Sequence, residues 1–145
     1  MSNEAQFSIQ RIYIKDSSFE SPLSPKVFTG EWKPGLKVDL NNRVNKLEGD
    51  NVEVVLTVTV TAELAGETAF LVEVQQAGLF LLKGLTEAQF EQAINVLAPT
   101  TLFPYIREAL DSMVIKGGFP AVGLQPVNFE ALYKQKMEQK APSAH

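Results

Sequence analysis

The chain has 145 residues, 17 of them acidic and 13 basic, and its net charge is −4 at pH 7. This balance argues against a nucleic-acid binder, which needs a basic patch, and the lack of cysteine excludes a disulfide framework and thiolate metal sites. No apolar run reaches the ~20 residues of a membrane span, and the first residues lack the basic and apolar regions of a signal peptide. We therefore expect one domain over residues 1–145, cytoplasmic and without direct membrane insertion, with a frayed tail at 140–145.

Alternation of apolar and polar residues predicts an antiparallel sheet of four strands, at about 6–15, 36–46, 52–64 and 68–82. The clearest is the third strand, in which apolar residues occupy every even position from Val52 to Leu64. The turn Leu64-Ala-Gly-Glu67 joins it to the fourth strand as a hairpin. Gly78 predicts a bend or bulge in that fourth strand.

The first predicted strand changes parity along its length. Phe7 and Ile9 share one parity, and Ile12 and Ile14 take the other. Such a switch indicates a β-bulge near Arg11, or else a strand that is partly buried on both faces.

Residues 16–35 contain three prolines and follow no regular period. Loops of ~20 residues inside a compact domain are uncommon and are often functional. Four large apolar side chains lie in this loop: Phe19, Val27, Phe28 and Trp32. Such side chains must either tuck into the core or line a binding site, and the pattern alone leaves both alternatives open.

Helical periodicity predicts three helices, at about 86–98, 101–117 and 128–139, packed on one face of the sheet in an α+β fold. Thr86 and Gln89 form a capping box at the start of the first helix. Pro99 ends this helix, and Pro104 is tolerated in the first turn of the next one. Asn128 caps the last helix.

The second predicted helix is apolar around most of its circumference. Its apolar residues are Leu102, Phe103, Tyr105, Ile106, Ala109, Leu110, Met113, Val114 and Ile115. A helix packed on one sheet needs an apolar stripe of only about 100°, so this helix is expected to bury two sides. The second side could meet another helix or another copy of the chain. With only three helices available, we favour an oligomer.

The chemistry of an enzyme is missing from the sequence. The only histidine is His145, in the expected tail, so catalytic triads and His-rich metal sites have no histidine in a defined place. No glycine-rich phosphate-binding motif is present. Glu53, Glu63 and Glu73 could pair across strands, but such carboxylates are more typical of a solvated sheet face than of a glycosidase. We predict a protein that is not an enzyme and uses no cofactor or metal.

The function class that remains is binding. The aromatic loop adjoins a strand on which Leu36, Val38 and Leu40 share one parity. Free backbone groups at a strand edge and apolar pockets together suit an extended polypeptide, because main-chain hydrogen bonds are independent of sequence. The residues thus favour a polypeptide-binding protein.

In six segments the exact residues are informative, in addition to their hydrophobic periodicity. They are 7–22 (FSIQRIYIKDSSFESP), 32–34 (WKP), 67–80 (ETAFLVEVQQAGLF), 102–108 (LFPYIRE), 118–120 (GFP) and 126–132 (PVNFEAL). In this order they resemble the SecB family of bacterial protein-export chaperones. The similarity covers roughly Phe7 to Tyr133, nearly the whole chain.

This resemblance implies both a fold and a function. The implied fold is an α+β subunit with a four-stranded antiparallel sheet, assembled as a homotetramer that is a dimer of dimers. The implied function is that of a cytosolic holding chaperone without ATPase activity. It would bind unfolded preproteins and deliver them to SecA, the motor of the translocase.

The resemblance also implies two sets of site residues. The client-binding residues would be Phe28, Trp32, Leu36, Val38 and Leu40. The surface that contacts the zinc-binding tail of SecA would comprise Asp16, Glu20, Leu71 and Glu73. Leu71 and Glu73 have the parity opposite to the buried side of the fourth strand, which is consistent with a surface role. Acidic residues there would attract a basic partner.

One segment departs from the family pattern, and two other functions are conceivable. Family members often end in a longer acidic or Gln-rich tail, whereas residues 134–140 here contain three lysines, so the resemblance leaves open whether the tail contacts the motor. A SecB-like chaperone could serve a dedicated client such as an antitoxin. A carrier of a small apolar ligand would instead be a monomer, and would leave the wide apolar helix unexplained.

Overall fold

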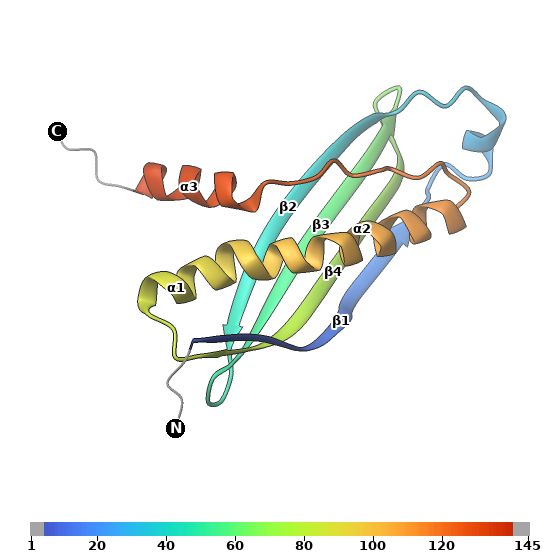
Figure 1. Ribbon diagram of the computed structural model, residues 1–145. Helices are drawn as coiled ribbons and strands as arrows, with labels where there is room; N and C mark the ends of the chain where they lie inside the picture. The colour runs from blue at the N-terminus through green and yellow to red at the C-terminus, as the bar shows by residue number, and fades with distance from the viewer. Residues whose placement is uncertain (1–4, 141–145) are drawn as a thin grey trace.

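The computed structural model describes residues 5–140 and shows one four-stranded antiparallel sheet with its helices mainly on one side, which confirms the expected α+β fold (Figure 1). The strand order is β1-β4-β3-β2, so β1 and β2 are the two edges. The strands are β1 Gln6–Glu20, β2 Gly35–Lys46, β3 Asn51–Leu64 and β4 Glu67–Lys83. The helices are α1 Glu87–Gln92, α2 Ala98–Lys116 and α3 Phe129–Lys140.

Strand β1 is longer than the sequence pattern predicts. Its pairing with β4 shifts at two places, between Ile9 and Arg11 and between Ile14 and Asp16. The first shift confirms the bulge expected near Arg11. The second reverses the parity again, which hides the rest of the strand from period-2 reasoning. The prediction that this strand ends near residue 15 is therefore wrong, and the strand continues to Glu20.

The central hairpin of β3 and β4 agrees with the prediction except at Gly78. Its turn residues Ala65 and Gly66 have φ angles of 52° and 79°, as a tight two-residue hairpin turn requires. Of the bend or bulge expected in β4, the bulge is absent, because pairing with β3 continues without a shift through Gly78. A Cβ atom at Gly78 would lie 2.6 Å from the ring of Phe80, so glycine is needed here for close packing.

The first two predicted helices are parts of one continuous helical stretch. A π-helical segment, Ala93–Leu97, connects α1 to α2, and Figure 1 shows both along one path. The predicted break at Pro99 is therefore wrong. The N–H of Ala98 donates to the carbonyl of Ala93, five residues earlier, so the hydrogen-bond ladder is already shifted where Pro99 lacks a donor. Pro104 lies inside α2 rather than at the start of a separate helix.

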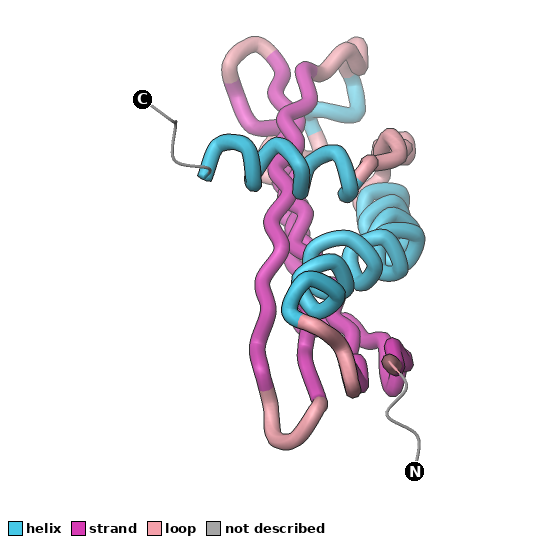
Figure 2. Tube along the Cα trace, turned by 60° about the vertical axis from the view of Figure 1, so that its left-hand side comes forward, coloured by secondary structure: helices cyan, strands magenta, loops and turns pink. Residues whose placement is uncertain are grey.

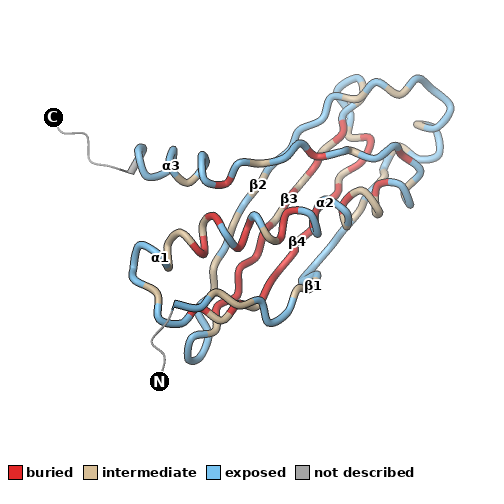
Figure 3. Tube along the Cα trace, viewed as in Figure 1, coloured by how far each residue is buried: buried red, intermediate tan, exposed pale blue. Residues whose placement is uncertain are grey.

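The hydrophobic core lies between the sheet and α2, which runs diagonally across β3 and β4 (Figures 1 and 2). Buried residues concentrate on these two strands and on the side of α2 that faces them (Figure 3). The largest fully buried side chains include Leu56, Phe70, Phe80, Leu102, Ile106 and Leu110. The opposite face of the sheet carries none of the helices of residues 5–140, so it is free for another role.

Helix α3 is capped as expected but packs differently. The side-chain oxygen of Asn128 accepts a 3.0 Å hydrogen bond from the N–H of Ala131. The helix reaches past the edge strand β2 instead of lying over the sheet, and Leu132 and Met137 remain exposed (Figure 1). The expectation that all three helices pack on one face of the sheet is therefore only partly confirmed.

The outward side of α2 has no cover from the rest of the described chain. Tyr105 is 50% exposed and Ile115 is 56% exposed. Within residues 5–140, the wide apolar band of α2 is therefore not covered by another helix of the same chain. None of the helices in this range is long and apolar enough to cross a membrane.

Candidate functional site

An apolar groove runs along the edge strand β2. Leu36, Val38 and Leu40 project to the same sheet face as the core, but α2 does not extend far enough to cover them. Leu36 and Val38 are therefore 47% and 48% exposed. The segment 119–128 returns from α2 to α3 and forms the other wall (Figure 1). The resulting groove has a volume of about 360 Å³ and is also lined by Val58, Phe103, Val122, Gly123, Leu124, Gln125 and Val127.

The other two predicted client-binding residues belong to an aromatic cluster at one end of this groove. The ring of Trp32 lies 4.9 Å from that of Phe119 and 6.1 Å from that of Phe70, measured between ring centroids. Phe28, on the short 3₁₀ helix Lys26–Thr29, lies 5.2 Å from Phe119 and is half exposed. Trp32 thus packs on the core, which agrees with the first alternative for the aromatic loop, whereas the ring of Phe28 is half exposed to solvent.

The groove continues toward α3. Leu40 and Val127 also line a second cavity of about 480 Å³, whose far wall is formed by Leu132 and Tyr133 of α3. The sequence pattern marks these α3 residues only as an apolar helix stripe. Their place beside β2 follows from the path of 119–128, which periodicity does not predict.

The four residues predicted for the acidic surface lie on the sheet face opposite α2: Asp16, Glu20, Leu71 and Glu73. Glu20 is the direct antiparallel partner of Leu71, so their side chains project to the same face. Asp16 and Glu20 are exposed and belong to β1, not to a loop after it. Glu73 is partly buried and accepts a 2.7 Å hydrogen bond from the hydroxyl of Thr59. The structure therefore brings the four together on one open face.

Glu53, near the other end of this open face, is a residue whose role the sequence pattern misses. It is only 7% exposed, so its interpretation as a solvated carboxylate is wrong. It accepts hydrogen bonds from the Tyr13 hydroxyl at 2.5 Å, the Lys15 ammonium at 2.8 Å and the Asn45 amide at 2.7 Å. Nothing in its own strand signals this, because all three partners lie on β1 and β2.

The electrostatics of this cluster follow from its contacts. Burial alone would raise the pKa of Glu53, but hydrogen bonds from Lys15, Tyr13 and Asn45 outweigh it and lower the pKa to about 2. Burial, together with the hydrogen bond to the ionised Glu53, raises the pKa of Tyr13 to about 12. Glu53 is thus a charged, fully partnered group that holds the sheet together and is not available to an incoming ligand.

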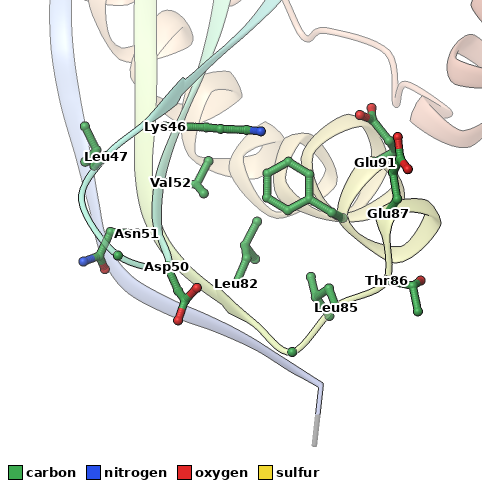
Figure 4. Close-up of a pocket in the computed structure, with 13 residues that line it drawn as sticks. Lys46, Leu47, Asp50, Asn51, Val52, Leu82, Leu85, Thr86, Glu87 and Glu91 are labelled. Carbon is green, nitrogen blue, oxygen red and sulfur yellow. The ribbon is translucent and has the colours of Figure 1, made fainter. Parts of the chain in front are cut away.

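A further cavity, of about 540 Å³, lies at the opposite end of β2 from the aromatic cluster, between the β2–β3 turn and α1. Figure 4 shows Lys46 extending from β2 toward the helix that carries Glu87 and Glu91. The Lys46 ammonium lies 4.9 Å from the centroid of the Phe90 ring. The Lys46 ammonium of the same chain thus already occupies the face of the Phe90 ring. No three His, Cys, Asp or Glu side chains of residues 5–140 are placed to hold a metal ion.

The comparison with solved structures identifies the fold. The chain superimposes with a TM-score of 0.68 on a Mycobacterium tuberculosis SecB-like chaperone solved in complex with a peptide from an antitoxin. The two sequences are 16% identical, and the match covers 83% of this chain and 90% of that one. This chain therefore has the SecB-like α+β fold.

The sequence comparisons identify the family. The family model described as preprotein translocase subunit SecB matches residues 1–140. "Protein-export protein SecB" of Pseudomonas syringae pv. tomato is 53% identical over 137 residues, which are 94% of this chain and 84% of that protein. The protein of the same name from Ectopseudomonas mendocina is 54% identical over 138 residues, which are 95% and 86% of the two chains. The chain belongs to the SecB family.

Proposed function

We propose that this chain is a cytoplasmic protein-export chaperone that holds unfolded preproteins and delivers them to the SecA motor. Membership of the SecB family supports the export function. The single observation that carries the holding function is the apolar groove along β2, where Leu36 and Val38 remain about half exposed beside a core that could have covered them. Exposed apolar rows of this kind mark interaction surfaces.

The groove suits an extended chain because of its strand geometry. Leu36, Val38 and Leu40 follow one another at every second residue, about 7 Å apart, which matches the spacing of alternate side chains in an extended client. The free edge of β2 offers backbone groups that any sequence can use. The chemistry of the site therefore selects extended and apolar segments rather than one particular sequence.

The groove residues also indicate how tightly a client is held. Fully burying a Leu or Val side chain contributes about 1.5–3 kcal/mol, and Leu36 and Val38 have only about half of this left to gain. One groove thus supplies a few kcal/mol, which corresponds to weak and readily reversible binding. Several grooves on one oligomer, each engaging another part of the same client, would raise the affinity without ATP.

The proposed assembly is a homotetramer formed as a dimer of dimers. The exposed outer side of α2, with Tyr105 and Ile115, supports a contact between copies. So does the free edge of β1, where Ile9 and Ile14 are each 46% exposed. Isologous pairing of both surfaces gives four chains with two kinds of interface.

The proposed docking surface for the zinc-binding tail of SecA is the open sheet face with Asp16, Glu20 and Glu73. Three carboxylates on one face attract a basic partner, and Leu71 among them offers an apolar contact. The client groove lies on the other side of the sheet, so client and motor could bind at the same time. The acidic net charge is also consistent with the absence of a nucleic-acid partner.

A dedicated client such as an antitoxin is the second candidate function. It is favoured by the fold shared with the Mycobacterium tuberculosis SecB-like chaperone, which was solved with an antitoxin peptide. The complete acidic set at Asp16, Glu20, Leu71 and Glu73 favours export instead, because a dedicated chaperone would not need a motor-docking face.

Native mass spectrometry tests the proposal. The protein would be mixed with a denatured, slowly folding preprotein, with the same preprotein after folding, and with an unfolded protein that lacks a signal peptide. We expect four chains with one unfolded client bound, and no complex with the folded preprotein. A monomer that ignores unfolded chains would contradict the export proposal.

A further inference from the structure

One wall of the groove is held in place by a single carboxylate on α2. The side chain of Asp111 accepts hydrogen bonds from two consecutive backbone N–H groups, those of Val122 at 3.0 Å and Gly123 at 3.2 Å. Both bonds end on the same carboxylate oxygen. Gly123 has a φ of +65°, in the left-handed region, where glycine is accommodated without strain.

This wall has few other polar attachments. Within the described residues, the backbone from 120 to 127 takes part in no backbone–backbone hydrogen bond. The segment is otherwise fixed by apolar side chains at its two ends and near its middle, where Phe119, Leu124 and Phe129 are buried. The two bonds to Asp111 are therefore what fixes its backbone between Phe119 and Leu124.

The residues that Asp111 holds are groove residues. Val122, Gly123 and Leu124 form the wall opposite Leu36 and Val38. Because the bonds join the wall to α2, which rests on the core, the carboxylate sets how far the wall stands from β2. Releasing it would let Val122 move and would change the width of the groove.

We propose that Asp111 is a positioning residue for client binding, which acts by anchoring residues 122–123 and does not touch the client. This inference rests on the proposed function, because it assumes that the client lies between β2 and this segment. It makes one specific demand: the site needs a hydrogen-bond acceptor at this position. The negative charge strengthens both bonds, but a neutral amide oxygen can still make them.

Two substitutions separate these requirements in the full-length protein. Asp111→Asn keeps a side-chain oxygen that can accept both bonds, whereas Asp111→Ala removes it. Glu108→Ala is the matched control, because it removes an exposed carboxylate three residues earlier on the same helix. Each variant would be compared with the wild type in two measurements. One is the hydrogen exchange of the Val122 and Gly123 amides, and the other is the dissociation rate of a denatured preprotein.

We expect Asp111→Ala to speed exchange at the two amides by about tenfold and client dissociation by about three- to tenfold, as the loss of one or two such bonds predicts. Asp111→Asn keeps the acceptor but loses the charge assistance, so it should lie closer to the wild type than to Asp111→Ala in both measurements. If Asp111→Ala folds poorly, Gly123→Ala provides the second variant, because it keeps Asp111 but strains the left-handed turn. It should speed dissociation in the same way.

The results separate this inference from the proposed function. If the wild type holds the preprotein and Asp111→Ala releases it no faster, the positioning role is wrong and the chaperone function stands. If Asp111→Asn fails as badly as Asp111→Ala, the charge matters and the anchoring role is overturned. If the wild type holds no client, the proposed function fails and this role fails with it.

Discussion

The Tyr13 hydroxyl donates a 2.5 Å hydrogen bond to the Glu53 carboxylate, although the two residues lie on strands that are not neighbours. Strand β4 runs between β1 and β3, and the bond crosses it. The direct partner of Tyr13 on β4 is Ala77, whose small side chain leaves room on the sheet surface for this crossing. The bond ties an edge strand to the middle of the sheet, on the face that no described helix covers.

Replacing this carboxylate should destabilise the fold. In Glu53→Gln the new NH₂ group would face donors from Tyr13, Lys15 and Asn45, so at least one of them would lose its partner in a buried place. We expect the free energy of unfolding to fall by about 2–3 kcal/mol in urea titrations at fixed protein concentration. Glu63→Gln, at an exposed position on the same strand, should change it by less than about 0.5 kcal/mol. Equal effects would show that the cluster carries no stability.

The same carboxylate predicts how stability depends on acid. The pKa of Glu53 is lowered from 4.5 to about 2 in the folded protein. Between these two pH values the unfolded chain therefore binds a proton at this carboxylate and the folded chain does not. Its contribution is therefore complete above about pH 4.5 and is lost as the pH falls toward 2. Over this interval the free energy of unfolding should drop by about 3 kcal/mol through this one group.

Denaturant unfolding between pH 6 and pH 2.5 would check this, with Glu53→Gln alongside. The substituted protein should be less stable at neutral pH and should lose less stability on acidification. A variant whose stability falls in parallel with that of the wild type would mean that other carboxylates are responsible.

The open face predicts a separation between motor binding and client holding. Asp16→Ala, Glu20→Ala and Glu73→Ala should each weaken binding to the isolated zinc-binding tail of SecA, by about 0.5–1 kcal/mol for the exposed pair. The loss should shrink at higher salt, because the contribution is electrostatic. Client dissociation should change by less than about twofold. If both activities fall together, the motor surface has been assigned to the wrong face.

The groove predicts the converse separation. Val38→Thr keeps a β-branched side chain on the strand but places a hydroxyl in the groove, and Leu36→Gln keeps a side chain of similar length but places an amide there. Together they should weaken client holding by about tenfold, since each removes apolar surface from the contact. The number of chains per oligomer should not change. Lys37→Gln and Asp39→Asn, which point to the other face of β2, are the matched controls.

Trp32 is less suited to this test than its place in the sequence suggests. Its ring packs on Phe70 and Phe119, so Trp32→Ala would remove part of the core as well as part of the site. A loss of client holding in that variant would not distinguish a binding role from a structural one. Phe28, which is half exposed, is the better probe of the aromatic cluster.

The predicted helices and strands were correct where one hydrophobic period described the whole segment. The even positions from Val52 to Leu64 gave β3 directly, because one of its faces meets α2 and the other has no such cover. The end of β1 was missed, since its second shift near Asp16 breaks the period where a loop was expected. Pro99 was misleading for a related reason: a π-helical turn precedes it, and no local sequence rule signals that turn.

The residues on β2 that line the candidate site could be predicted from the sequence, but their arrangement with the rest of the site could not. The parity of Leu36, Val38 and Leu40 placed them on one face of a strand. That the strand is an edge, and that 119–128 forms the opposite wall, depends on the order β1-β4-β3-β2. The contacts of Glu53 join β3 to β1 and β2, and those of Asp111 join α2 to a segment without regular structure, so no period could reveal them.

Hydrogen exchange of the protein with and without a denatured preprotein tests the central claim most directly. If the client lies in the groove, protection should increase at residues 36–40 and 122–127. Residues 71–75 on the open face should not change. Protection confined to the open face, or spread evenly over the molecule, would contradict a client site along β2.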